Sequence, residues 1–384
     1  MGSCSADFQR LAQQLGEFGC EGQNAFVNLH NPFGLDHWTM LLFEIVTVLG
    51  AVLALRHALR LRRQGDPTVL ALWIASLAYL AIVEPPLYFP DAFGLQEQTG
   101  LIFVHNEFTV QFMWGRLPLY IVAIYPVMVT LAYEVVRQAG VFARRGPFVS
   151  AITVGFVYHV FYEFFDHVGP QLRWWIWNPT APSNEPFLAS VPISSMVTFA
   201  VAGPVALTFL VRVLVARHPQ VASLGTGPLV GRSVLAGLLM PIGLVLGGMP
   251  ATIFTFAEET NRTGQAIAYW TVLGLVTVVA VPTLISAVRS RQRGEGAEEG
   301  ARRYLLTHAG IYLGALVVSW AAALPDYVDA VDSITADGTP IGSLPYALAC
   351  LVVCIALLVL VVRRGNLRDA DILTPLSEGS AVSV

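Results

Sequence analysis

The sequence predicts an all-α, polytopic integral membrane protein with about nine transmembrane helices, an outside N-terminus and a cytoplasmic C-terminus. Three observations support this prediction. Of the 384 residues, 55% are hydrophobic and only 12% are charged, which is about half the charged share of an ordinary soluble domain. The apolar residues form segments long enough to span a bilayer. The arginines alternate between loops as a nine-span topology requires.

The apolar segments set the number of helices. A helix needs about 20 mostly apolar residues to cross the hydrocarbon core. The candidate spans are 38–59, 68–87, 117–137, 147–166, 190–214, 229–256, 266–288, 304–324 and 344–362. Several spans contain proline, which membrane helices tolerate because neighbouring groups satisfy the freed backbone.

Arginine placement tests this count. All 22 basic residues are arginine, and with nine spans 18 of them fall on one face of the membrane. Only Arg10, Arg116, Arg173 and Arg262 fall on the other. Because cytoplasmic loops carry the excess of basic residues, the arginine-rich face is predicted to be cytoplasmic. Arginine without lysine is typical of a GC-rich genome, so a bacterial plasma membrane is expected.

The chain is predicted to have three parts. Residues 1–37 form an extracytoplasmic tail, 38–363 the transmembrane domain, and 364–384 a disordered cytoplasmic tail. Two long outer segments, 88–116 and 167–189, are rich in aromatic residues and are predicted to form short interfacial helices or re-entrant caps. Cys4 and Cys20 either pair as a disulfide outside the cell or remain free thiols.

Charge and cysteine spacing exclude two classes of protein. The net charge of −4, with no basic run interleaved with aromatic residues, argues against a nucleic-acid partner. The sequence contains no C-x-x-C pair, which excludes a zinc ribbon and a thioredoxin-type motif.

Acidic residues mark the outer end of every even-numbered span. Carboxylates at a helix C-terminus are mildly unfavourable, so this pattern indicates that something positive collects there, such as a proton, a metal ion or a cationic intermediate. The alternative is that outer loops take acids for solubility. These residues are Glu84, Glu163, Asp166, Glu258, Glu259, Asp326 and Asp329.

The fourth span carries the sharpest candidates. At 100° per residue, His159, Glu163 and Asp166 fall within about 60° of one another on the helix, with His167 at the edge. Ionisable groups inside a membrane are expensive and usually mark function. The alternative is a buried His–Glu hydrogen bond with interfacial Asp166 and His167. Glu84, where two prolines are expected to end the second span, is a further candidate acid or base.

Aromatic residues gather toward the same side. Tyr88, Tyr120, Tyr162, Trp175 and Trp177 are the candidates for lining a substrate pocket. Membrane interfaces attract Trp and Tyr in any case, but ring faces also stabilise carbocations. Acids and aromatic rings under a cap would suit proton-initiated chemistry on a polyene or isoprenoid.

Metal binding is the competing interpretation of the histidines. His159, Glu163 and His167, with His105 or Glu84, have the ligand types that zinc and iron take. The eight histidines are scattered, however, and membrane di-iron oxygenases carry many more in pairs. No metal and no cofactor are therefore assigned.

The segment Trp175-Ile176-Trp177, followed by Pro186, Leu188 and Val191-Pro192, resembles membrane-integral carotenoid hydratases and related prenyl (terpene) cyclases. These are small all-helical membrane proteins with intramembrane carboxylates. The resemblance covers about residues 155–195, and this chain has more helices than such enzymes. It implies protonation of a substrate double bond by Asp or Glu, then water capture or ring closure. Roles for Glu84, Glu163 and Asp166 follow from it only as analogies.

The favoured hypothesis is a membrane enzyme, a hydratase or cyclase acting on an isoprenoid or other lipid. Glu163 or Glu84 would be the general acid, and Asp166 and His159 would orient it or act as base. This predicts a closed pocket under the outer caps, lined by Glu84, His159 and Glu163, which Glu44 would join.

Two other functions stay open. A transporter or lipid-handling protein would use the acids to bind protons or cations, and predicts a polar path to the arginine-rich face. A non-catalytic subunit predicts an exposed apolar patch on the outer segments. The expected partners are membrane lipids and a lipophilic small molecule, and an oligomer or a membrane partner remains open.

Overall fold

The computed structural model describes residues 4–16, 19, 22–255, 260–290 and 298–371, the last nine without their side chains. Within these ranges, nine helices are long and apolar enough to cross a membrane, which confirms the predicted fold class. They are α2 (Trp38–Arg63), α3 (Thr68–Tyr88), α5 (Leu119–Gln138), α6 (Pro147–Asp166), the composite Ile193–Ala216, α9 (Thr226–Thr255), α10 (Arg262–Arg289), α11 (Glu299–Val328) and α12 (Leu344–Asp371). The chain is a multi-pass integral membrane protein.

The fifth span is not a uniform α-helix. It consists of α7 (Ile193–Val197), a π-helical turn η1 (Thr198–Ala202), α8 (Gly203–Val211) and a second π-helical turn η2 (Arg212–Ala216). Pro204 follows η1 at the start of α8. Because proline has no backbone N–H and its ring crowds the preceding turn, a widened turn at this point is a common accommodation.

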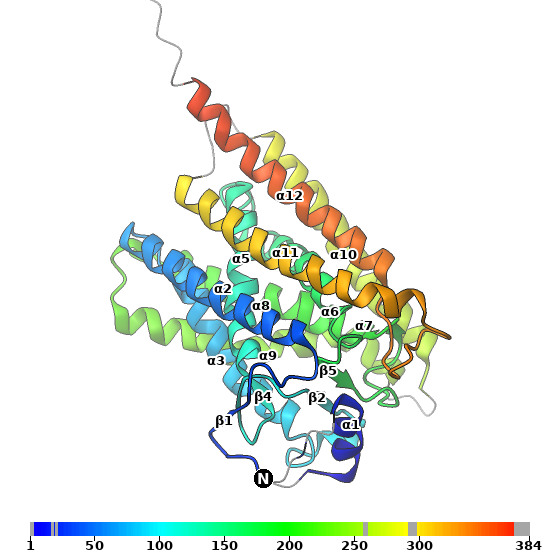
Figure 1. The fold of residues 1–384 in the computed structure, drawn as a ribbon. Coiled ribbons are helices and arrows are strands. Elements are labelled where there is room, and N and C mark those ends of the chain that lie inside the picture. Colours follow the sequence, from blue (N-terminus) through cyan, green and yellow to red (C-terminus); the bar gives the residue numbers. More distant parts are fainter. Residues whose placement is uncertain (1–3, 17–18, 20–21, 256–259, 291–297, 372–384) are drawn as a thin grey trace, which may run out of the picture.

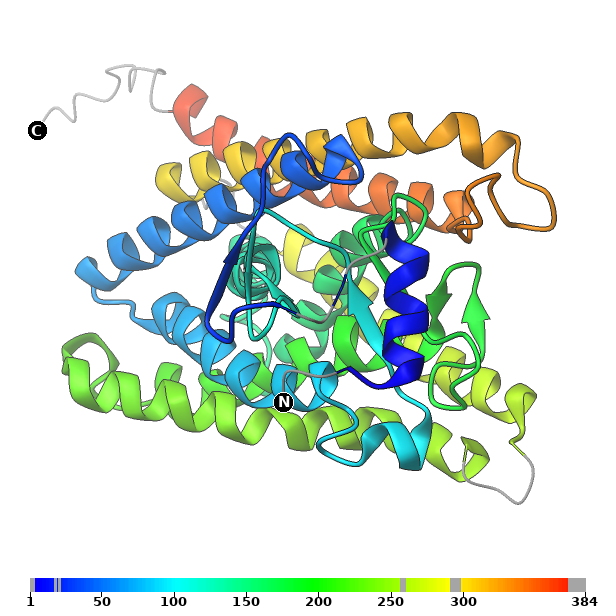
Figure 2. The same ribbon diagram turned by 60° about the horizontal axis from the view of Figure 1, so that its bottom comes forward.

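Helices α5 and α6 form the centre of the bundle. Of the most apolar stretch of each, 83% of α5 and 72% of α6 is buried, the highest shares among the nine spans. Figures 1 and 2 show α2, α11 and α12 on one side of these helices and α3 and α9 on the other. Most side chains of α5 and α6 therefore meet protein rather than lipid.

The arginine-rich ends of the helices lie together. Arg62 at the end of α2 bonds Thr226 at the start of α9 (2.7 Å), and Arg60 bonds Glu298 just before α11. Arg144, in the loop before α6, bonds the carbonyl of Ser290 after α10 (3.2 Å). This end is called the arginine-rich end below.

Short strands and helices cover the opposite, capped end. Of the short helices predicted in the two outer segments, the described residues contain one, α4 (Leu95–Thr99), and the cap also contains short antiparallel strands. Strand β1 (Val27–Leu29) pairs with β3 (Val110–Phe112), and β3 with β4 (Leu117–Pro118). Strand β2 (Phe103–His105) pairs with β5 (Trp175–Trp177), and β6 (Phe187–Leu188) with β7 (Val191–Pro192).

The predicted N-terminal tail contributes to this cap. Helix α1 (Ala6–Gly16) buries Phe8, Leu11 and Leu15 against Ile102 and Val104 beside and within β2. Cys4 is disulfide-bonded. Figure 2 shows α1, in dark blue, lying across the strands at this end.

Several residues singled out in the sequence lie outside the part of the chain that the structure describes. Cys20, Glu258, Glu259 and residues 291–297 and 372–384 lie outside the described residues. The backbone of α12 continues to Asp371, eight residues into the segment predicted as a disordered tail.

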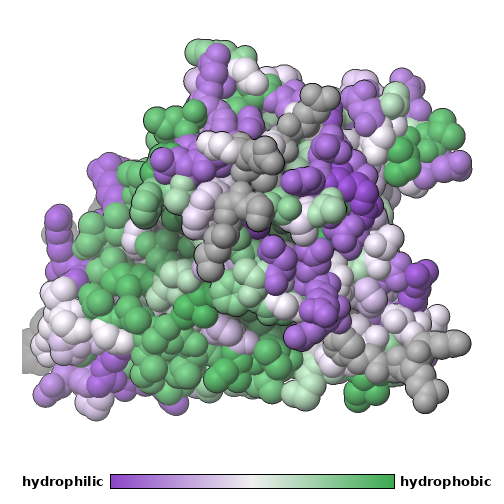
Figure 3. All heavy atoms as spheres, turned by 90° about the horizontal axis from the view of Figure 1, so that it is seen from below, coloured by the Kyte–Doolittle hydropathy of each residue, from purple (hydrophilic) through white to green (hydrophobic). Residues whose placement is uncertain are grey.

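Exposed hydrophobic side chains cover the flanks of the bundle. On α9, Ile242, Val245 and Ile253 are more than half exposed, as are Leu275 and Val278 on α10. Figure 3 shows such residues spread over a broad area of the molecule seen from below. In a membrane this surface faces lipid chains, which are as apolar as leucine.

The crossing of α3 and α9 depends on a glycine. A Cβ atom added at Gly237 would lie 2.5 Å from the carbonyl oxygen of Ala75 and 2.9 Å from the amide nitrogen of Tyr79.

We expect Gly237→Ala to force the helices apart and lower the free energy of unfolding by about 1–3 kcal/mol, measured by thermal unfolding in detergent. Gly231→Ala on the same helix meets nothing within 4 Å and should not destabilise. Equal stability of the two variants would contradict close packing at Gly237.

Candidate functional site

A cavity of about 300 Å³ lies under the cap, in the middle of the bundle. Helices α3, α5 and α6 form one side, α7, η1 and α8 another, and strands β2 and β5 close the capped end. Most of its lining is aromatic or aliphatic. Seven predicted site residues line it, namely Glu84, Tyr88, Tyr120, Tyr162, Asp166, Trp175 and Trp177.

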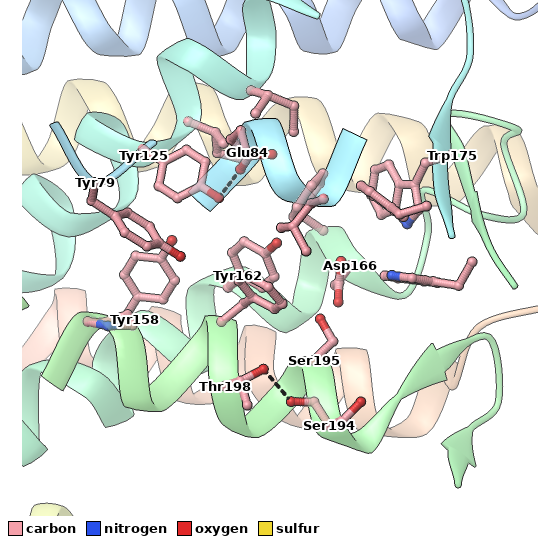
Figure 4. A pocket seen from close by; sticks show the side chains of 18 of the residues that line it. Tyr79, Glu84, Tyr125, Tyr158, Tyr162, Asp166, Trp175, Ser194, Ser195 and Thr198 are labelled. Atoms are coloured by element: carbon pink, nitrogen blue, oxygen red, sulfur yellow. Dashed lines mark hydrogen bonds between the residues drawn. The ribbon is translucent and has the colours of Figure 1, made fainter. Parts of the chain in front are cut away.

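Glu84 enters the cavity from α3, one turn before the helix ends. The prediction that the two prolines after Glu84 end the helix is wrong, because α3 continues to Tyr88. Proline can occupy a helix when the backbone keeps its φ near −65°, and the amide of Phe89 bonds the carbonyl of Pro85 (3.0 Å) to close the last turn. The Glu84 side chain is buried and accepts a hydrogen bond from the Tyr125 hydroxyl, which Figure 4 shows.

Asp166 enters the cavity from the last residue of α6. It is 1% exposed, and within the described part of the chain its Oδ2 atom has no hydrogen-bond partner. Figure 4 shows its carboxyl group among aromatic rings, with the Ser195 side chain pointing toward it. An unsatisfied buried polar atom is costly, so it calls for an explanation in terms of function.

Tyrosine rings form the wall between these two carboxyl groups. Tyr79 packs edge-on against Tyr125 at a centroid distance of 5.2 Å, and Tyr158 stacks on Tyr162 at 5.6 Å. Tyr158 and Tyr162 share a face of α6 because they are four residues apart. Tyr79 was not among the residues predicted from the sequence, although it is the one tyrosine within an otherwise apolar stretch of the second predicted span.

Polar side chains of the fifth span line the other wall. Ser194, Ser195 and Thr198 all face the cavity. The Thr198 hydroxyl donates to the carbonyl of Ser194 (2.7 Å) across the start of η1. These residues were also missed, although a polar cluster at the start of an apolar span was the available signal.

His105 joins the cap to the helices. Its Nε2 atom lies 2.8 Å from the Tyr88 hydroxyl and its Nδ1 atom 2.9 Å from the Tyr120 hydroxyl. Burial lowers the pKa of His105 to about 3, so the ring is neutral at pH 7 and one nitrogen accepts while the other donates. His105 therefore fixes both tyrosine rings at the cavity wall.

His159 and Glu163 do not line the cavity, so the predicted lining is right for Glu84 and wrong for these two. The advance of 100° per residue turns Asp166, Tyr162 and Tyr158 toward α3 and α5. The same advance turns His159 and Glu163 toward α12. The sequence predicted that these residues share one face of α6. That face is wide enough for one part to line the cavity and the other to contact α12.

Glu163 lies between two imidazole rings. Its carboxylate oxygens are 3.4 Å from His159 Nδ1 and 3.6 Å from His167 Nε2. The far side of His159 meets the Tyr346 hydroxyl at 2.7 Å, and the Ser343 amide donates to His167 Nδ1 at 3.2 Å. Because that nitrogen accepts a hydrogen bond, a neutral His167 carries its proton on Nε2, facing Glu163.

Metal binding finds no support in the geometry of these side chains. Among the described residues, no three His, Cys, Asp or Glu side chains are placed to hold a metal ion. His105 is engaged at both nitrogens by tyrosines.

Glu44 has a structural role. It was expected to join the cavity, but it accepts hydrogen bonds from the backbone amide (3.0 Å) and hydroxyl of Thr109. It therefore anchors the start of β3 to α2 and does not line the cavity.

A buried acid at the arginine-rich end was not predicted from the sequence. Glu134 on α5 is fully buried, and Arg137 Nε donates to both of its oxygens at 2.9 and 3.1 Å. Gln138 donates at 2.8 Å, and His57 Nε2 lies 3.4 Å away. Each buried carboxylate oxygen has a partner, in contrast to Asp166, which is typical of a structural ion pair.

The buried histidines of the cap predict a loss of stability in acid. Burial lowers the pKa of both His105 and His167 to about 3, whereas a histidine in the unfolded chain takes up its proton near the ordinary pKa of 6.5. Stability is therefore complete above that value and falls as the pH drops, by roughly 2–3 kcal/mol per histidine down to about pH 4.5. Thermal unfolding in detergent at several pH values should show a smaller acid loss for His105→Gln than for the wild type. Equal losses would contradict this account.

Comparison with known protein families, characterised proteins and solved structures finds no match to this chain.

Proposed function

We propose that this chain is a membrane enzyme that acts on a lipophilic substrate, an isoprenoid or another lipid, by acid–base chemistry in the cavity under the cap. The observation that carries the proposal is Asp166, whose buried Oδ2 atom has no partner within the described residues and which lines the aromatic cavity. Structural acids of this chain, such as Glu134 and Glu44, have their oxygens hydrogen-bonded. Ionisable groups inside membrane proteins are functional candidates by default.

The lining favours an apolar substrate. Rings of Tyr, Trp and Phe make up much of the wall, and the few polar groups are the two carboxyls, hydroxyls, His105 and Asn184. Ligand pockets typically measure 300–1,000 Å³, so about 300 Å³ suits one end of a long chain better than a whole lipid. Such a substrate would reach the cavity from the membrane.

Asp166 is the proposed acid. Its carboxyl proton would pass to one carbon of a substrate double bond, leaving a carboxylate on Asp166 and a positive charge on the neighbouring carbon. The electron-rich ring faces of Tyr158 and Tyr162 would stabilise that charge. No further reactant is needed for this step.

Glu84 is the proposed base. The carbocation would either take up water, which then loses a proton to Glu84, or be attacked by a second double bond of the same chain, after which a carbon loses a proton to Glu84. The first outcome is hydration and the second is an isomeric ring closure. The Tyr125 hydroxyl, which donates to Glu84, holds the carboxylate in place.

This assignment changes the roles expected from the sequence. Glu163 and His159 lie behind Asp166, outside the cavity, so we assign them as positioning residues rather than as acid and base. The carboxyl groups of Glu163 and Asp166 are close enough to influence each other electrostatically. A transporter is less well supported, because the described residues that line the cavity include no arginine and none from the arginine-rich end.

Replacing either carboxyl in the cavity should abolish product. We expect Asp166→Asn and Glu84→Gln each to lower product formation at least about 100-fold, the usual contribution of a general acid or base. Mass spectrometry of lipid extracts from expressing cells measures this, and a gain of 18 mass units or an isomeric product identifies the reaction. Asp326→Asn, at an exposed acid at the capped end of α11, is the matched control. If no lipid differs between wild type and variants at equal expression, the enzyme proposal is wrong.

The tyrosine wall offers a separate test of the cationic intermediate. Tyr162→Leu removes a ring and should lower product formation about tenfold. Tyr162→Phe keeps the ring and should retain most of the activity. Similar losses in the two variants would argue for a role of the hydroxyl group instead.

A further inference from the structure

A second, larger hollow lies at the arginine-rich end, far from the proposed catalytic cavity. It measures about 930 Å³ and lies between the end of α2 and the start of α11. The lining contains four arginines, Arg56, Arg60, Arg63 and Arg303. None of these residues takes part in the proposed reaction.

The arginines of α2 converge because of their spacing. Residues 56, 60 and 63 are separated by four and three positions, so their side chains leave the same face of the helix. Arg60 bonds Glu298, and Arg303 pairs with Glu299 at 3.0 Å. Within the described part of the chain, neither Arg56 nor Arg63 lies within ion-pair distance of a carboxylate, and both are exposed. Four arginines against two glutamates leave the lining with a net charge of +2.

The start of α11 adds to the positive potential. Glu299 begins this 30-residue helix, whose first free N–H groups carry a partial positive charge. Gly300 allows close approach, because a Cβ atom there would lie 1.2 Å from a guanidinium nitrogen of Arg60. The guanidinium of Arg60 therefore lies directly against the helix terminus.

The same hollow has an apolar wall. Val52, Leu55 and Leu59 line it beside the arginines. Farther along α2, toward the capped end, Ile45 and Leu49 are about half exposed. A free inorganic anion would use the arginines alone, whereas a lipid would use both the charged and the apolar parts.

We propose that this hollow, called the groove below, binds a phospholipid with an anionic headgroup. The phosphate would lie among Arg56, Arg60, Arg63 and Arg303, and an acyl chain would lie along Val52 and Leu59 of α2. Arginine binds phosphate through paired N–H donors, and basic pockets between membrane helices are known sites for anionic headgroups. The proposal does not depend on the function assigned to the other cavity.

The test compares lipids on the purified full-length chain in a neutral detergent. Thermal unfolding and native mass spectrometry are measured with added phosphatidylglycerol, phosphatidylcholine or inorganic phosphate. We expect phosphatidylglycerol alone to raise the unfolding temperature and to remain bound. The double variant Arg56→Gln/Arg63→Gln should bind it about tenfold more weakly, because each arginine contributes to headgroup attraction.

A matched control separates a site from diffuse attraction. Arg217→Gln/Arg289→Gln removes the same charge from exposed arginines of the same end that do not line the groove. This variant should bind phosphatidylglycerol as the wild type does, and both variants should unfold at the wild-type temperature in phosphatidylcholine. Equal weakening in the two variants, equal stabilisation by phosphatidylcholine, or an equal effect of inorganic phosphate would each overturn the proposal.

Discussion

The cost of placing ionisable groups in hydrocarbon governs this structure. In lipid, backbone groups must be satisfied within the protein, and charged side chains must face its interior or its ends. The five acids of the first four spans, Glu44, Glu84, Glu134, Glu163 and Asp166, are all buried. Their inward direction determines which faces of α5 and α6 can form the centre of the bundle. The lipid-facing helices α9 and α10 carry no acid in their described spans.

These buried acids differ in how fully they are satisfied. Glu134 has an arginine and an amide on its oxygens. Glu163 has only two imidazoles at 3.4 and 3.6 Å, and one oxygen of Asp166 has no partner among the described residues. Glu134 lies at the arginine-rich end, whereas Glu163 and Asp166 lie toward the cap. The carboxyl groups with few hydrogen-bond partners therefore lie near the β2–β5 pair and His105, which hold the walls of the cavity in place.

The sequence was sufficient to predict the spans, because a length of about 20 apolar residues is set by bilayer thickness and does not depend on neighbours. It also identified Glu84, Asp166 and five aromatic residues of the cavity. It could not predict that Asp166 faces the cavity and Glu163 faces α12, because this difference depends on which helix packs against each side of α6. The strands of the cap were missed because segments of two or three residues, such as Phe103–His105, are too short to show an alternating pattern. Tyr79 and Ser195 were missed because their role depends on long-range packing.

The π-helical turn η1 in the fifth span determines which of the side chains around it point into the cavity. A turn that closes five residues apart holds one residue more than an α-helical turn, so side chains on its two sides are rotated by about 100° from the positions that an unbroken α-helix would give. Ser194 and Ser195 precede η1, and Leu207 follows it, yet all three face the same cavity. Loss of a single residue within Thr198–Ala202 would restore a regular helix and turn the two serines away from Asp166. The polarity of this wall is thus encoded by one additional residue in the backbone as well as by the identity of its side chains.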